Sequence, residues 1–221
     1  MDTLLLQLIG PMQSWGVQSR FGVRDTGLEP SKSGVIGLLC AALGRPRTAP
    51  VDDLVRLRMG VRVDREGQIA KDFHTALGVY RANGQVNASG AEISNRYYLM
   101  NAAFLVGLEG DLPTLETLQA ALRSPVWSLY LGRKAFVPAA PVWLPDGLRK
   151  GEGLEEALRR YPWLCGDAAQ RPTRLRVVLD DDQGEQVRPD VPVSFAERRF
   201  TSRRVHGTFF DIQEGACTSH N

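Results

Sequence analysis

Four polar residues within ten positions could together perform acid–base chemistry on RNA. Lys71, Asp72, His74 and Tyr80 lie in one polar stretch of the chain. A ribonuclease that needs no metal must deprotonate a ribose 2′-hydroxyl and stabilise the leaving oxygen, and such side chains can carry those protons. The alternative is a histidine that packs or hydrogen-bonds within its own segment. We favour the alternative because His74 has no visible partner base, and keep Lys71, His74 and Tyr80 as a catalytic hypothesis.

Aromatic and basic side chains alternate in several predicted loops. Trp15, Arg20 and Arg24 follow the first predicted strand, Arg96–Tyr98 ends the polar stretch, and Arg133–Lys134 comes after a short apolar run. Unstacked bases bind to aromatic rings and arginine planes, while Arg and Lys hold phosphates. A single aromatic residue is more often part of a core, but the combination favours binding of RNA.

The segment Gly27–Ser33 resembles a nucleotide-binding loop only superficially. A Walker A loop needs four residues between its glycines and then Lys-Ser or Lys-Thr. Here Ser31 replaces the second glycine and the spacing is one residue short. Nucleotide hydrolysis is therefore not expected. Lys32, Ser33 and the free N–H groups at a helix start could still hold one backbone phosphate.

The composition excludes several classes of protein. Cys40, Cys165 and Cys217 are far apart and form no CxxC pair, so we expect neither a metal site nor another cofactor. An odd, dispersed set of cysteines indicates a reducing cytoplasm. The N-terminus has no basic region or cleavage site of a signal peptide, and no apolar run approaches the roughly 20 residues of a membrane span.

Charge is unevenly distributed along the chain. The sequence holds 27 basic and 25 acidic residues, a net charge of +2, which excludes a uniformly basic coat. Residues 191–210 are locally basic, whereas residues 152–190 are acidic and include Asp180–Asp182. This separation suits a protein with an anionic partner on one face.

The predicted elements favour an α+β fold. A strand, helix, strand, inserted hairpin, strand and helix are followed by a further strand, in the split βαβ order of ferredoxin-like folds and RRM domains. Asn83-Gly84 is a hairpin signal within the insertion, and the proline-rich text after residue 135 leads into a small C-terminal β-rich part. The expected ranges are 4–9, 33–44, 59–64, 71–98, 102–108, 113–123 and 129–131, then 153–161, 174–179 and 186–194.

Five short motifs follow one another along the chain: Leu8–Gly16, Pro30–Leu39, Lys71–Gly78, Arg96–Leu99 and Tyr130–Lys134. In this order and spacing they resemble the CasD family, a subunit of Cascade, the type I-E CRISPR surveillance complex. The resemblance covers residues 1–140 well and the C-terminal third loosely.

The resemblance implies a RAMP-superfamily domain at 1–140 with a hairpin "thumb" at about 72–98, and a small subdomain at 141–221. It implies binding of the 5′ handle of the CRISPR RNA (crRNA), capping of the backbone filament, and contacts with the backbone subunit CasC and the large subunit CasA. Another subunit, CasE, cleaves the precursor in this subtype, so the chain is expected to be non-catalytic. A sister subtype uses the corresponding subunit as the processing ribonuclease, which keeps the catalytic hypothesis open. The glycine-rich loop common in RAMP proteins is reduced to Arg203–Gly207.

With the resemblance, fourteen residues are expected to contact RNA. They are Gln13, Trp15, Arg20, Arg24, Lys32, Ser33, His74, Arg81, Arg96, Tyr97, Arg133, Lys134, Arg203 and Arg204.

Overall fold

The computed structural model describes residues 1–16, 22–80, 84–86, 90–166 and 172–211. Within them the helices are α1 (Lys32–Leu43), α2 (Asp52–Val55), α3 (Leu112–Arg123) and α4 (Leu154–Arg160). The strands are β1 (Asp2–Ile9), β2 (Met12–Gln13), β3 (Val23–Arg24), β4 (Arg58–Arg65), β5 (Gln68–Leu77), β6 (Ala91–Met100), β7 (Ala103–Gly110), β8 (Trp143–Arg149), β9 (Arg174–Asp180), β10 (Gln186–Ser194) and β11 (Arg199–Asp211).

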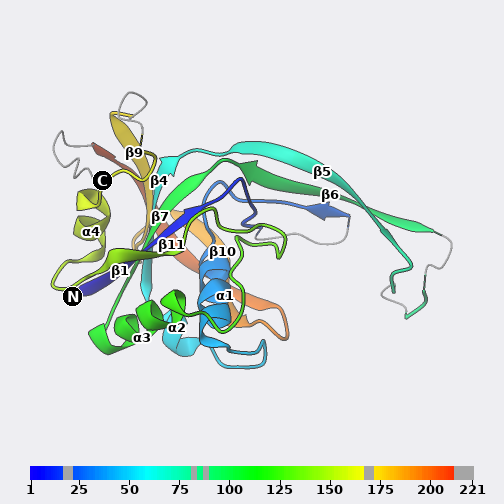
Figure 1. The fold of residues 1–221 in the computed structure, drawn as a ribbon, viewed down its shortest axis with the longest axis horizontal. Coiled ribbons are helices and arrows are strands. Elements are labelled where there is room, and N and C mark those ends of the chain that lie inside the picture. The colour runs from blue at the N-terminus through cyan, green and yellow to red at the C-terminus, as the bar shows by residue number, and fades with distance from the viewer. Residues whose placement is uncertain (17–21, 81–83, 87–89, 167–171, 212–221) are drawn as a thin grey trace.

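A seven-stranded sheet forms the body of the molecule (Figure 1). Its order is β10-β11-β9-β4-β7-β1-β8, and every neighbouring pair is antiparallel. The α+β class predicted from the sequence is confirmed.

Each face of the sheet carries a hydrophobic core, because helices pack on both sides of it. Successive strand residues point to opposite sides and so enter different cores. In β1, Leu4, Leu6 and Leu8 belong to the larger core, together with the apolar faces of α1 and α3. Leu5, between them, belongs to a second core with Leu154 and its neighbours on α4. A strand buried on both sides has no polar alternation, which is why the sequence from Leu4 to Ile9 is apolar except for Gln7.

Helix α1 begins and ends where the sequence predicts. Ser31 lies just before it and its hydroxyl accepts a hydrogen bond from the Gly34 N–H, which satisfies a free donor of the first turn. Gly44 ends the helix in the left-handed conformation, with φ of +69°, that favours glycine.

An antiparallel arm projects from the body (Figure 1). Strands β5 and β6 pair from Gln68↔Met100 to Leu77↔Ala91, so the inserted hairpin is longer than the predicted 72–98. Strands β2 and β3 pair with β6 near the body and complete a second, four-stranded sheet.

Two expectations differ from the structure. The strand predicted at 129–131 is wrong, because Leu131 lies in a tight loop in which its N–H donates to Phe136 O and its carbonyl accepts from Ser14 N. The strand that completes this edge of the sheet is β8. The segment after residue 140 is β-rich as predicted, but β9, β10 and β11 extend the central sheet rather than forming a separate one.

Among the described residues, no helix is long and apolar enough to cross a membrane.

Candidate nucleic-acid interface

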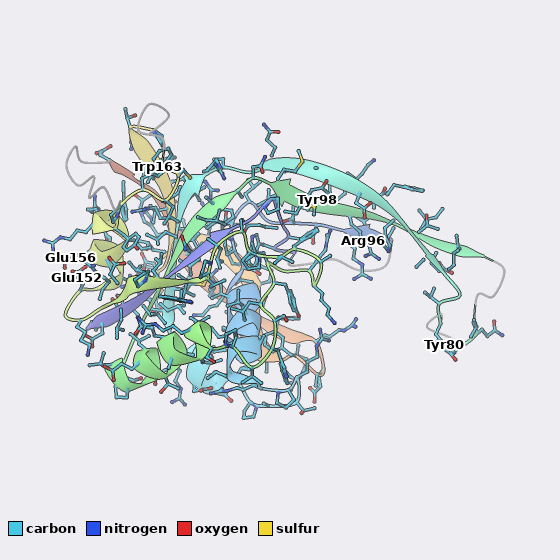
Figure 2. All side chains as sticks on the ribbon, in the orientation of Figure 1. Tyr80, Arg96, Tyr98, Glu152, Glu156 and Trp163 are labelled. Carbon is cyan, nitrogen blue, oxygen red and sulfur yellow. The ribbon has the colours of Figure 1, made fainter. Side chains whose placement is uncertain are left out.

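Three arginines from separate segments gather where the arm leaves the body. Arg24 lies on β3, Arg96 on β6, and Arg133 in the loop 131–136; we call them the arginine cluster. Arg24 and Arg96 are direct partners in the parallel β3–β6 ladder. Arg133 Nη2 donates to Tyr97 O at 2.7 Å and to Arg24 O at 3.5 Å, which brings the third guanidinium beside the other two. Figure 2 shows Tyr98 nearer the body and Arg96 farther along the arm.

The loop 131–136 is held rigidly against the first segment of the chain. Leu131 is fully buried and bonds to Phe136 and Ser14 through its backbone. Gly132 has φ of +88°, and a Cβ there would lie 1.7 Å from Ser14 O, so only glycine fits. The turn directs the half-buried Arg133 toward β6 and leaves Lys134 exposed.

Two aromatic rings pack against the cluster. The Arg133 guanidinium lies 5.4 Å from the centroid of Phe136, within cation–π range. Phe136 in turn packs against Tyr98 at 5.7 Å between centroids. Arg133 is therefore positioned by both its hydrogen bond and its ring contact.

Within the part of the chain that the structure describes, the positive charge of the cluster is not offset by close ion pairs, although Asp72 and Asp25 lie near enough to attract Arg133. None of the three arginines forms an ion pair with any residue that the structure describes. Burial, followed by repulsion from Arg96 and Arg24, lowers the pKa of Arg133, against smaller attractions to Asp72 and Asp25. Arginine stays charged in proteins, so the site favours an anion. An adjoining cleft of about 270 Å³ includes Ser33, Arg24 and Arg133 in its lining, together with the carboxylate of Asp25.

Two residues expected at the RNA, Gln13 and Trp15, are part of the core instead. Both are essentially inaccessible. The Gln13 amide donates to Leu8 O and Ala102 O, and its carbonyl accepts from the Trp15 indole N–H. These bonds satisfy the buried polar atoms and tie the first loop to the sheet, so neither side chain can reach a ligand.

Lys32 and Arg203 are also not available for phosphates. Both belong to a buried network with Asp180 and Asp190. Lys32 Nζ lies 2.9 Å from Asp180 Oδ2, and its backbone N–H donates to Asp190 Oδ2 at 2.8 Å. Arg203 bonds to both Asp190 oxygens and to Asp180. Burial lowers the pKa of Arg203, but Asp190 and Asp180 outweigh it and the net shift is upward. The helix start predicted to hold a phosphate is thus occupied by Asp190.

The proposed acid–base groups are not brought together. Lys71 and His74 point to opposite faces of β5 because strand side chains alternate. His74 Nδ1 lies 3.5 Å from Asp72 on its own strand, and both are about half exposed. Tyr80 is at the far end of the arm, bridged to Val86 (Figure 2). The three predicted catalytic residues therefore do not share one site.

The remaining candidates lie in different places. Tyr97 is on β6 opposite Lys71, half-buried, and its carbonyl accepts from Ser14 and Arg133. Arg204 is exposed on β11, away from the cluster, and donates to Gly184 O. Arg20 and Arg81 lie outside the described residues. Among the described residues, no group of three potential ligands could hold a metal ion.

Comparison with known proteins identifies the family. The model of the family described as CRISPR-associated protein (Cas_Cas5) matches residues 3–206. This chain belongs to that family. The resemblance to CasD found in the sequence is confirmed: the CRISPR system Cascade subunit CasD of Escherichia coli (strain K12) is 31% identical over 178 residues, covering 74% of this chain and 79% of that protein.

Two solved structures of CRISPR-associated proteins match nearly the full length of this Cas5-family chain. A structure described as "Crystal structure of Cas protein" has a TM-score of 0.79 at 45% identity, covering 95% of both chains. A chain of a "CRISPR RNA-guided surveillance complex" has a TM-score of 0.78 at 34% identity, covering 95% of this chain and 90% of that one. The match includes the C-terminal strands that the sequence placed only loosely.

Proposed function

We propose that this chain is a non-catalytic subunit of a Cascade-type CRISPR complex that binds the 5′ handle of the crRNA and caps the backbone filament. The observation that carries the proposal is the unneutralised arginine cluster at the base of the arm. Its partners would be the crRNA and, by the family resemblance, the subunits CasC and CasA.

The cluster suits a strongly bent RNA backbone. Guanidinium groups bind phosphates through paired, charge-assisted hydrogen bonds. Arg24, Arg96 and Arg133 come from three segments of the chain, so their N–H donors are spread over a surface. Phosphates of an RNA that changes direction can each meet one of them. Lys134 beside them adds a further positive charge.

The arm is suited to act as a wedge. Ile69, Phe73, Leu77 and Ile93 share one face of the β5–β6 pair, and each is more than half exposed. The opposite face carries Asp72, His74 and Arg96. An apolar face of this kind could separate stacked bases, as expected for the family's thumb, and thereby bend the RNA.

The strand order supports the RRM-like interpretation of the core. Strands β4-β7-β1-β8 lie side by side, with α1 on the connection from β1 to β4 and α3 on that from β7 to β8. This is the spatial order of a split βαβ unit. Here the added strands β9, β11 and β10 continue from β4.

The dispersed acid–base groups favour binding without cleavage. With Lys71 and His74 on opposite faces of β5, proton transfer by both at one ribose would need the strand to rotate. We therefore expect repeat RNA to stay intact when incubated with the full chain in EDTA, and to be retained on a filter. The RNA would be examined on a denaturing gel.

His74→Ala provides the matching control. It should leave both the intact RNA and its retention nearly unchanged, because His74 is about half exposed and its contact among the described residues is with Asp72 on its own strand. A discrete cleavage product that disappears in His74→Ala would contradict the proposal and identify the chain as the processing nuclease.

A further inference from the structure

A second groove opens beside the arginine cluster, along α1. It has a volume of about 400 Å³, and Gly37 and Ala41 of the helix lie in its floor. The segment after α3 forms one wall, since Val126 N–H donates to Ala42 O and Trp127 N–H to Ala41 O. Phe195, between β10 and β11, lies on the other wall.

The walls of this groove carry accessible aromatic rings, one of which, Phe195, also packs against the core. Trp127 is 48% exposed and Tyr130 38% exposed. Phe195 is partly buried and contacts Phe200 edge-on, with centroids 6.4 Å apart. Large rings left accessible in a concave site are typical of surfaces on which ligands stack.

The groove is continuous with the cleft at the arginine cluster. The two share the lining residues Ser33, Gly34, Gly132 and Phe195. The lining of the groove includes Arg45 and Arg47 and no carboxylate. Arg45 pairs with Asp53 outside the lining, whereas Arg47 forms no ion pair with any described residue. Aromatic walls, a cationic rim and a phosphate site next to the groove are together the features of a binding site for single-stranded nucleic acid.

We propose that this groove, bounded by Trp127, Tyr130 and Phe195, binds a nucleobase splayed out of the RNA whose backbone lies on the arginine cluster. The inference rests on the proposed function, because the backbone must first be held at the cluster. The ring of the base stacks on the aromatic walls, and Arg47 accompanies its phosphate. Stacking tolerates any base, so the groove contributes affinity rather than a strict sequence requirement.

Two kinds of variant test the groove. Trp127→Ala with Tyr130→Ala removes the stacking surface. Gly37→Leu fills the groove from its floor: a Cβ at Gly37 meets only Phe195, at 3.8 Å, and a helical glycine replaced by leucine favours the helix. The probe is repeat-derived 5′-handle RNA, intact or with one abasic nucleotide placed at each position in turn, and dissociation constants are measured by filter binding.

We expect both variants to bind intact RNA about 5- to 100-fold more weakly, as removal of one stacked base implies. For the natural chain, removing the base at one position of the RNA should weaken binding by a similar factor. For the groove variants, the same abasic RNA should bind no more weakly than intact RNA. The single variant Trp127→Phe, which keeps an aromatic ring at this position, should bind intact RNA almost as tightly as the natural chain. Phe209→Ala, which removes an exposed ring on β11, is the control and should change nothing.

The outcomes separate the groove from the proposed function. If the natural chain retains RNA and the groove variants bind equally well, the groove inference is overturned while the function stands. If those variants instead weaken only assembly with other subunits, the groove is a protein-docking site and the inference fails. If the natural chain binds no handle RNA even with CasC present, both are overturned.

Discussion

Replacing Arg24 and Arg96 together by glutamine is expected to weaken retention of handle RNA by about 100-fold. Each charged hydrogen bond to a phosphate contributes roughly 1.5 kcal/mol or more, and every 1.4 kcal/mol is a factor of ten. Glutamine keeps a polar side chain of similar length, and Arg133 stays in place to hold the loop 131–136 through Tyr97. The measurement is filter binding over a range of salt concentrations.

The salt dependence distinguishes phosphate contacts from a general loss of structure. Losing two phosphate contacts should reduce the slope of log K against log salt by about 1.4, because a single-stranded contact contributes about 0.7. Arg159→Gln with Arg160→Gln removes the same charge from α4, where these residues pair with Glu155 and Glu156. That control should keep the affinity; a control as weak as the cluster variant would contradict the assignment.

Asp180→Ala is expected to lower the free energy of unfolding by about 3–5 kcal/mol, which for a chain of this size is roughly 6–20 °C in melting temperature. Lys32 and Arg203 are both about nine-tenths buried and would lose a shared carboxylate. Met59 N–H would also lose its acceptor. The measurement is denaturant unfolding of the full chain.

Two further substitutions define the effect at Asp180. Asp182→Ala removes a neighbouring exposed carboxylate and should change stability by less than about 0.5 kcal/mol. Asp180→Asn keeps hydrogen-bonding atoms but not the charge, so it should fall between the two. A loss of less than about 1 kcal/mol for Asp180→Ala would show that the buried cations are stabilised by other groups.

Local sequence signals located the elements of the fold well. The predicted helix at 33–44 matches α1 to within one residue at each end, and largely apolar runs located β1 and β7. The strand predicted at 129–131 was wrong. Its apolar residue Leu131 is fully buried, as in a strand, but it reaches the core from a loop. Burial alone does not distinguish a strand from a loop whose backbone bonds are satisfied by distant partners.

The arginine cluster could be predicted in part, and the distance between partners in the sequence explains the rest. Arg24, Arg96 and Arg133 were all among the candidates, and the structure brings them together. Lys32 was read as a phosphate ligand because its partner Asp180 lies 148 residues away. A local reading cannot see a pairing of that kind.

Residue type alone did not distinguish buried side chains from accessible ones. Gln13 and Trp15 resembled ligand-binding residues, yet they satisfy each other within the core. Trp127, Tyr130 and Phe195 were not singled out, although they are accessible in a groove. The motif Tyr130–Lys134 could have drawn attention to these rings, because it begins at the groove and ends at the arginine cluster.

The most direct test is to map where the handle lies on this subunit in the assembled complex. crRNA carrying photoreactive uridines in its 5′ handle would be crosslinked, and the modified peptides identified by mass spectrometry. We predict crosslinks within loop 131–136, within β6 near Arg96 and within the segment of Arg24, with the RNA recovered at full length. Crosslinks confined to other surfaces, such as α4 and β8, would contradict the account.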